Sequence, residues 1–326
     1  MLYYDPRWRG KHGIGRFASA VLEKLQGEPL RLTGSPAAPL DLFRLSFALN
    51  QVHPGSVFFS PGYNAPLFSR VPFIFTLHDL NHIDRPENSS PLKRLYYFLV
   101  LKRACRRAAY VLTVSNYSKS RIVEWSGLPV DRVVNVGNGV DAAFQPGVDP
   151  YLPGYPYLLC VGNRKLHKNE FRVVTGFSQS RVPPEMRLIF PGNQSLELAA
   201  HIEKMRMTER VVFAGSVPES RLPSLYKGAV ALVFPSLYEG FGLPVIEAMA
   251  CGTPVITSNT TSLPEVAGDA ALLVDPESVD EIAAAIGMLV NDRALQEELR
   301  KKGYQQAAKY TWARTSERVL EVLRKA

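Results

Sequence analysis

Two glutamates, Glu239 and Glu247, stand on either side of a glycine-rich turn in the segment FPSLYEGFGLPVIEAMAC, residues 234–251. We expect Glu239 to lie on a loop after the apolar strand Ala229 to Phe234, and Glu247 to lie in the first turn of the following helix. Both carboxylates can then face one cleft. Taken alone, Glu247 would merely complement the helix dipole and Glu239 would be solvated. Together with the turn between them, they favour a site for a polar or anionic ligand.

The turn itself predicts where the helix begins. Gly240 and Gly242 permit backbone conformations that other residues avoid, and Pro244 suits a first helical turn, where its missing amide hydrogen is not needed. We therefore expect a helix from about Leu243. Its unpaired amides and its dipole would attract an anion.

This segment resembles the Glu-x7-Glu motif of the retaining nucleotide-sugar glycosyltransferases of family four, which have the two-Rossmann-domain architecture called GT-B. The resemblance implies that Glu239 lies beside the donor sugar and that Glu247 binds the ribose hydroxyls. It also implies that the backbone at Phe241, Gly242 and Leu243 contacts the donor sugar or its phosphate.

A second motif, VGNRKLHKN at residues 161–169, resembles the turn in which this family holds the donor diphosphate. Lys168 matches the family's diphosphate-binding lysine, and Arg164 is the expected second cation. The family often has Arg where this chain has Asn163 and His167, so the second phosphate contact is left open.

Further motifs extend the resemblance over nearly the whole chain. They are HGIGRF (12–17), TLHDL (76–80), TVSNYSKSRI (113–122), NGVDAAFQP (138–146), TSLPEVAGDAALLVDP (261–276) and YTWARTSERVL (310–320).

The TLHDL motif places His78 and Asp79 at the end of an apolar strand, where a doubly wound sheet presents its ligand-binding edge. A histidine there can donate a hydrogen bond to a sugar hydroxyl or phosphate, and the resemblance places His78 near the donor sugar. A His-Asp pair at a strand end is often only a turn in which the Asp bonds its own backbone. The role of Asp79 therefore stays open.

The glycines of GKHGIGRF, including Gly15, also match a dinucleotide-binding turn. A nicotinamide enzyme would usually carry an acid after the second strand, but LRLTGS has none, and the chain has no Tyr-x3-Lys pair. By resemblance, the loop with Gly15 instead lines the donor and acceptor crevice.

The composition indicates two domains of ordinary size, because 326 residues with 46% hydrophobic content can bury two cores. Neither a leader peptide nor an apolar stretch of about 18 residues is present, so we expect a cytoplasmic protein. The three scattered cysteines suggest buried, reduced thiols. No Asp-x-Asp pair occurs in the chain, so we expect neither a metal nor another cofactor.

The expected fold is α/β, with two Rossmann-like doubly wound domains facing across a cleft. Short apolar runs alternate with helical stretches in both halves, and the Pro- and Gly-rich segment from Ala142 to Tyr155 is the best linker. We expect an acceptor-side domain over residues 1–148 and a donor domain over 149–310. By resemblance, a final helix over 311–326 crosses back to the first domain.

Residues 91–108 concentrate basic side chains among aromatic and aliphatic ones. With a net charge of +8, a helix here could lie on an anionic membrane surface at the inner face of the membrane. An ordinary packed helix with a solvated basic face has the same composition, and the sequence leaves both interpretations open.

The resemblance implies a metal-independent, retaining transferase that moves a sugar from a nucleotide-diphosphate donor to a glycan or lipid-linked acceptor in cell-surface polysaccharide or lipopolysaccharide synthesis. GDP-mannose is the first expectation for the donor and a UDP-sugar the second. A nucleotide-sugar epimerase of the same architecture is one alternative, and a nonenzymatic basic binding protein is another. Interleaved basic and aromatic nucleic-acid motifs are absent, so we expect no nucleic-acid partner.

Overall fold

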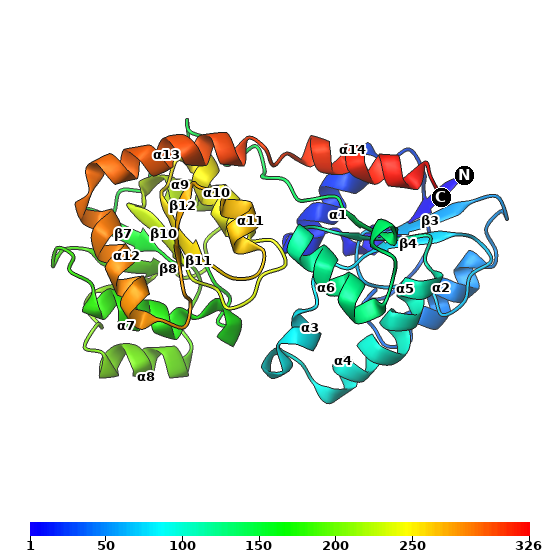
Figure 1. Cartoon of the computed structure of the whole chain (residues 1–326), viewed down its shortest axis with the longest axis horizontal. Coiled ribbons are helices and arrows are strands. Elements are labelled where there is room, and N and C mark those ends of the chain that lie inside the picture. Colours follow the sequence, from blue (N-terminus) through cyan, green and yellow to red (C-terminus); the bar gives the residue numbers. More distant parts are fainter. The chain divides into compact units, whose positions relative to one another are not determined.

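The computed structural model describes all 326 residues, and the chain divides into two compact units (Figure 1). Unit 1 consists of residues 1–139 and 311–326, and unit 2 consists of residues 140–310. The boundary falls just before the segment expected to be the linker and earlier than the expected boundary at 148/149, and the last helix belongs to unit 1.

Unit 1 contains a six-stranded sheet in which all paired strands are parallel, in the order β2-β1-β3-β4-β5-β6. The strands are β1 (Leu2–Tyr4), β2 (Glu28–Pro29), β3 (Val57–Ser60), β4 (Phe73–Thr76), β5 (Tyr110–Thr113) and β6 (Val133–Asn135). Each of these strands except β2 coincides with a short apolar run, as the alternating pattern predicted. That strand was missed because both of its residues are exposed and neither belongs to an apolar run.

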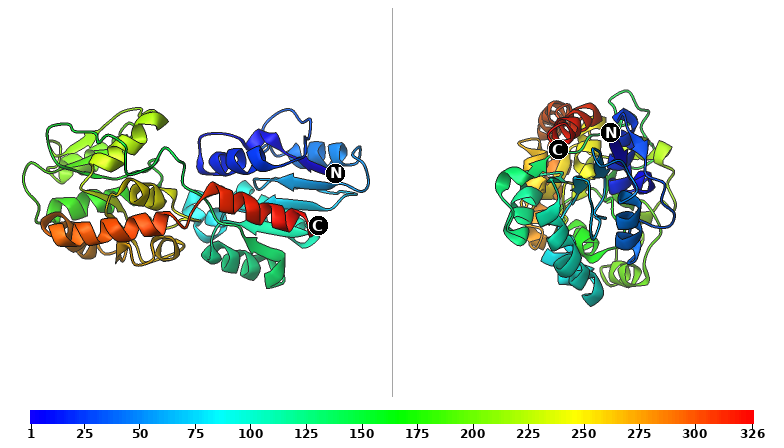
Figure 2. Two further views of the ribbon diagram at one scale, coloured as in Figure 1. Left: turned by 90° about the horizontal axis from the view of Figure 1, so that it is seen from above. Right: turned by 90° about the vertical axis from the view of Figure 1, so that its right-hand side faces the viewer.

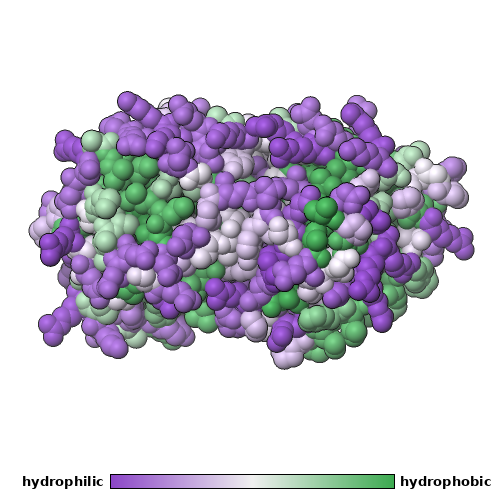
Figure 3. Space-filling view, viewed as in Figure 1, coloured by the Kyte–Doolittle hydropathy of each residue, from purple (hydrophilic) through white to green (hydrophobic).

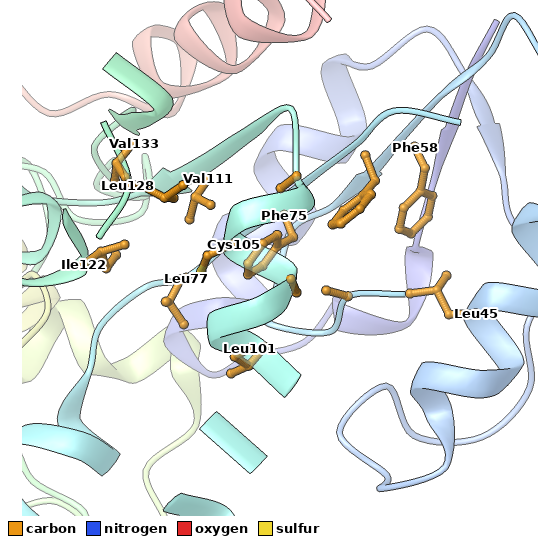
Figure 4. Packing of buried hydrophobic residues seen from close by; sticks show 14 of the residues in the cluster. Leu45, Phe58, Phe75, Leu77, Leu101, Cys105, Val111, Ile122, Leu128 and Val133 are labelled. Atoms are coloured by element: carbon orange, nitrogen blue, oxygen red, sulfur yellow. The ribbon is translucent and has the colours of Figure 1, made fainter. Parts of the chain in front are cut away.

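Helices of unit 1 cover both faces of this sheet. They are α1 (Gly13–Lys24), α2 (Asp41–Leu49), α3 (Asn81–Asp84), α4 (Pro91–Tyr96), α5 (Lys102–Arg107), α6 (Asn116–Ser126) and α14 (Trp312–Leu323), with a π-helical turn (Tyr97–Leu101) joining α4 to α5. Buried side chains from the sheet and from α2, α5 and α6 form one core, which includes Leu45, Phe58, Phe75, Cys105 and Ile122 (Figure 4). Helix α14 packs beside α1, and both chain ends lie near each other in this unit (Figure 2).

Unit 2 contains a second parallel six-stranded sheet, in the order β12-β11-β10-β7-β8-β9. Its strands are β7 (Tyr157–Leu159), β8 (Arg187–Phe190), β9 (Val211–Phe213), β10 (Ala231–Phe234), β11 (Val255–Ser258) and β12 (Ala271–Val274). Its helices are α7 (Glu170–Gln179), α8 (Leu196–Lys204), α9 (Leu222–Gly228), α10 (Leu243–Cys251), α11 (Leu263–Ala267), α12 (Val279–Asn291) and α13 (Arg293–Ala307). Each unit is therefore a doubly wound α/β domain, which confirms the expected fold class.

The two sheets differ in strand order. Unit 2 has the order 3-2-1-4-5-6 of a dinucleotide-binding sheet, whereas in unit 1 the first strand lies between the second and the third. The point at which the winding reverses is consequently between β7 and β10 in unit 2 and between β1 and β3 in unit 1. Ligands of doubly wound sheets bind beyond the carboxyl ends of these strands. No helix of the chain combines the length and the apolar character needed to span a bilayer.

Candidate functional site

The two motifs with candidate donor-binding residues lie where the winding of the unit 2 sheet reverses, between β7 and β10. We call this point, and the corresponding point of unit 1, the switch point. The loop of Lys168 follows β7, and the loop of Glu239 follows β10, the strand that pairs with β7. Both loops therefore leave the same edge of the sheet, where a ligand of this fold is expected.

The charged groups of Lys168 and Glu239 meet at this edge. Lys168 Nζ lies 2.6 Å from Glu239 Oε1, and each side chain is 14% exposed. The Ser236 hydroxyl donates to the same carboxylate oxygen at 2.7 Å, and Lys168 Nζ lies 5.1 Å from the centroid of the Phe234 ring. Both charges are shielded from water on most sides, so they act on a bound ligand more strongly than exposed charges would.

Helix α10 begins at Leu243, as its turn predicts. Gly242 adopts φ 105° and ψ 54°, and a Cβ at this position would lie 2.6 Å from Leu263 Cδ2. Both its conformation and its surroundings therefore require glycine. No side chain caps this helix, so the amides at its start suit an anion.

The expected place of Glu247 was wrong. Helix α10 has no acid in its first turn, because Glu247 is the fifth residue of a helix with 3.6 residues per turn. Its side chain is buried, and the hydroxyl of Tyr226 on α9 donates to Glu247 Oε2 at 2.9 Å. This bond orients the carboxylate.

Hydroxyl groups from the end of β11 and the segment after it hold the loop of Glu239, and the sequence analysis predicted no role for them. Ser262 Oγ lies 2.9 Å from the carbonyl oxygens of both Glu239 and Phe241, and Ser258 Oγ donates to the Ser236 carbonyl at 2.6 Å. Thr261 has φ 60°, which is rare for a β-branched residue and common where function requires strain. Thr261 and Ser262 begin the TSLPEVAGDAALLVDP motif, whereas Ser258 lies outside every motif that the sequence analysis quoted.

Arg164, the expected second cation, is bonded within the protein. It has φ 62°, and its Nη1 lies 2.6 Å from Glu170 Oε1. Its Nε and Nη2 donate to the carbonyls of Asn193 and Pro191 at 2.9 and 2.8 Å. A Cβ at Gly162 would lie 2.0 Å from the same Glu170 oxygen. These bonds use three of the five guanidinium N–H groups, and contact with a phosphate stays a prediction.

Asn169 links two loops at this edge of the sheet through hydrogen bonds. It is buried and has φ 62°, and its amide nitrogen donates to the carbonyls of Pro235 and Pro276 at 2.9 and 2.6 Å. The ends of β7, β10 and β12 are thereby linked beside Lys168. In the sequence analysis, Asn169 was only the last residue of the VGNRKLHKN motif.

In unit 1, His78 lies beside α1. Its Nε2 is 3.0 Å from the carbonyl oxygen of Pro61, and its ring packs edge-on against Phe17. His12 accepts a hydrogen bond from Gly15 N and so caps α1, while a Cβ at Gly15 would lie 2.5 Å from the backbone of Gly10. Gly15 is therefore required for the close approach of this loop.

Asp79 forms a local turn, the simpler of its two interpretations. Its Oδ1 accepts from the backbone amide of Asn81 at 2.9 Å, an arrangement in which a side chain begins a turn by bonding the residue two positions on. Asp79 thus helps to start α3.

Burial lowers the pKa of His78 to about 4 from its ordinary 6.5, and the charge of His12 acts in the same direction, against the opposing effect of the Pro61 hydrogen bond. The unfolded chain therefore takes up this proton before the folded chain does. The resulting stability is fully present above about pH 6.5 and is lost as the pH falls towards 4.

We accordingly expect wild-type protein to lose more unfolding free energy between pH 7 and pH 5 than the His78→Gln variant. Urea unfolding at both pH values measures this difference. Equal losses in the two proteins would contradict it.

The three cysteines are all free and buried. Burial raises the pKa of Cys105 to about 12 and that of Cys251 likewise to about 12, so these thiols are protonated at neutral pH. No group of three or more His, Cys, Asp or Glu side chains is arranged to hold a metal ion. Metal independence stays a prediction.

Comparison with known proteins identifies the family. The family model named Glycosyltransferase Family 4 matches residues 3–144, and that named Glycosyl transferases group 1 matches residues 150–306. The chain belongs to the family-four glycosyltransferases of the GT-B class.

Several curated relatives are mannosyltransferases. O-antigen chain mannosyltransferase B of Escherichia coli is 34% identical over 253 residues, which cover 73% of this chain and 66% of that protein. MMP alpha-(1->4)-mannosyltransferase of Mycolicibacterium hassiacum is 30% identical over 258 residues, which cover 72% of this chain and 59% of that protein. The chain thus spans less than two thirds of each relative.

Solved structures of other proteins share the fold of this chain. Anabaena HepE in complex with UDP-glucose has a TM-score of 0.78 at 18% identity and covers 100% of this chain and 99% of its own. WaaG, a glycosyltransferase involved in lipopolysaccharide biosynthesis, has a TM-score of 0.73 at 14% identity, with 99% of both chains covered. At these identities the likeness concerns the fold alone.

Proposed function

We propose that this chain transfers a sugar from a nucleotide-diphosphate donor to a glycan or lipid-linked acceptor in the synthesis of a cell-surface polysaccharide. The observation that carries the proposal is the shielded Lys168–Glu239 pair, 2.6 Å apart, at the switch point of unit 2. A cation suits the diphosphate, and a carboxylate suits the hydroxyl groups of a sugar. Glu247, oriented by Tyr226, would accept from the ribose hydroxyls.

GDP-mannose is the preferred donor, because the relatives described above are named as mannosyltransferases. A UDP-sugar is the second candidate, because HepE was solved with UDP-glucose. The polysaccharide is inferred from relatives whose names refer to the O-antigen chain.

We propose that transfer proceeds with retention and by attack on the front face of the sugar. Double displacement would require a carboxylate nucleophile beneath the anomeric carbon, and Glu239 is already engaged by Lys168 and Ser236. In front-face attack the bond from the anomeric carbon to phosphate oxygen breaks while the acceptor oxygen bonds to that carbon, and the departing phosphate takes the acceptor's proton. Lys168 and the start of α10 would stabilise the growing negative charge without a metal.

A thermal-shift screen with UDP, GDP, ADP and their sugars tests donor binding. We expect stabilisation by one nucleotide and its sugar conjugate, and loss of this stabilisation in Glu247→Ala. If no nucleotide raises the melting temperature, the proposal fails.

Two further measurements distinguish the transferase from an epimerase and from a nonenzymatic basic protein. An epimerase would convert the donor in the absence of an acceptor, which NMR of the donor alone detects. A nonenzymatic basic protein would give a salt-sensitive gel shift with nucleic acid and no nucleotide-sugar binding.

Contact with an anionic membrane is a second part of the proposal. In the helical stretch 91–107, four large apolar side chains are exposed: Leu92, Leu95, Phe98 and Leu99. Exposed arginines lie among them, including Arg94, Arg103 and Arg106, and Figure 3 shows hydrophobic and hydrophilic residues side by side over α4. An ordinary packed helix would bury its apolar side chains, so their exposure favours a lipid surface.

We expect the double variant Leu95→Glu/Phe98→Glu to bind vesicles containing phosphatidylserine about tenfold more weakly than wild type, because it removes apolar contact and adds repulsion. Vesicle pelleting measures the binding. Leu196→Glu, which alters an exposed leucine on α8 of unit 2, is the matched control. Equal pelleting of wild type with neutral and anionic vesicles would refute the membrane contact.

A further inference from the structure

A buried polar network occupies the switch point of unit 1. Three members follow β1, one ends β3 and one follows β3, the strands between which the winding reverses. One further member begins α2. They are Asp5, Arg7, Trp8, Asp41, Ser60 and Asn64. All except Arg7 are buried as whole residues, and the side chain of Arg7 is only 9% exposed.

Arg7 bridges the two carboxylates of the network. Its Nε and Nη2 donate to Asp5 at 2.9 and 2.7 Å, and its Nη1 and Nη2 donate to Asp41 at 2.6 and 2.9 Å. Burial alone would lower the pKa of Arg7, but hydrogen bonds and charge from the two aspartates raise it above its usual value. One cation thus stands between two buried carboxylates, and further donors are needed to complete the site.

Asn64 supplies these donors. Its Nδ2 donates to Asp5 at 2.8 Å and to Asp41 at 3.1 Å, and its Oδ1 accepts from Trp8 Nε1 at 2.6 Å and from Ser60 Oγ. The orientation of the amide follows from chemistry, because carboxylates only accept and an indole N–H only donates. Every hydrogen-bonding position of the Asn64 amide is therefore used.

The network fixes both ends of the short loop from Ser60 to Asn64. Within this loop, the carbonyl of Gly62 accepts from the Thr76 amide at 3.2 Å, and a Cβ at Gly62 would lie 2.3 Å from the Trp8 ring. The ring of Pro61 restricts its own φ. The carbonyl of Pro61 is consequently held in one direction.

That carbonyl determines the protonation of His78. It can only accept a hydrogen bond, so the His78 nitrogen 3.0 Å away, Nε2, must carry the proton. In the neutral ring Nδ1 is then an acceptor. The expectation that His78 donates to a phosphate or sugar hydroxyl is therefore wrong for the neutral ring, whose one N–H group is taken by Pro61.

We propose that the network of Asp5, Arg7, Asp41 and Asn64 is a positioning device that holds His78 as the Nε2–H tautomer, with Nδ1 presented to accept a hydrogen bond from a hydroxyl group of a sugar substrate. The last part rests on the proposed function, whereas the tautomer does not. His78 touches the substrate, and the network acts through it.

Nitrogen-15 NMR of histidine-labelled full chain tests the proposal, with His78→Gln used to assign the signal. Wild type is expected to show His78 with Nε2 protonated and Nδ1 unprotonated at pH 7. In Asn64→Ser, which removes the amide but keeps both aspartates and Arg7, a mixture of both tautomers is expected. Ser60→Ala is a second, milder variant that retains every charge of the network, and Asn291→Ser on α12 is the control.

The kinetic result separates this inference from the proposed function. We expect Asn64→Ser to lower kcat/KM for the sugar donor about tenfold while the affinity for the free nucleoside diphosphate stays unchanged. A wild-type His78 protonated on Nδ1, or an unchanged tautomer in both folded variants, overturns the positioning role. A tautomer change without any sugar transfer in wild type would support that role and refute the proposed function.

Discussion

Replacing Glu239 with Gln is expected to reduce kcat for sugar transfer by about 100-fold while binding of the free nucleotide survives. Gln keeps the size of the side chain but removes the charge that Lys168 pairs with at 2.6 Å. The sugar loses its charged acceptor and its orientation relative to the leaving phosphate. Lys168, released from its partner, remains available to a diphosphate, so nucleotide affinity should be unchanged or higher.

Steady-state kinetics and calorimetric titration of the nucleotide measure the two effects separately. Glu277→Gln is the matched control, because Glu277 is exposed and lies in the same unit outside the site. Wild-type turnover in Glu239→Gln would show that Glu239 has no role in transfer. A loss of nucleotide binding as large as the loss of kcat would show that Glu239 binds the nucleotide rather than the sugar.

Replacing Lys168 with Ala is expected to weaken donor binding by at least about tenfold. The change removes a cation from the diphosphate and also leaves the carboxylate of Glu239, only 14% exposed, facing the same negative charge without its partner. The loss should therefore exceed the value of the direct contact alone.

This argument makes a prediction about the double variant Lys168→Ala/Glu239→Gln. Neutral Gln does not repel the diphosphate, so the double variant should bind the nucleotide more tightly than Lys168→Ala alone, and the two changes should not be additive. Lys165→Ala is the control, because Lys165 is exposed in the same loop. Additive losses would contradict the coupling, and unchanged donor binding in Lys168→Ala would refute its role.

Local signals in the sequence predicted most of the fold. Buried parallel strands appear as apolar runs because helices cover both faces of the sheet, and glycine and proline indicated where α10 begins. Strand β2 escaped prediction because Glu28 and Pro29 are exposed, and only its pairing with β1 defines it. Glu247 was placed one turn too early, since its distance from Leu243 exceeds one helical turn.

The contacts of the candidate site depended on the tertiary structure. Lys168 and Glu239 are 71 positions apart in the chain, and they meet because β7 and β10 are neighbours in the sheet. No role was predicted for Ser258, Ser262 or the network of Arg7, because most of the hydrogen bonds that define their roles run to other elements. Family resemblance selected the motifs, but it did not indicate that Arg164 would bond to Glu170.

The most direct test of the central claim is to follow by NMR, in the presence of EDTA, the reaction of the full chain with GDP-mannose or UDP-glucose and a methyl mannoside acceptor. The account predicts release of the nucleoside diphosphate and a new glycosidic linkage with the anomeric configuration of the donor. An inverted linkage, activity that EDTA abolishes, or no turnover of either donor would contradict it.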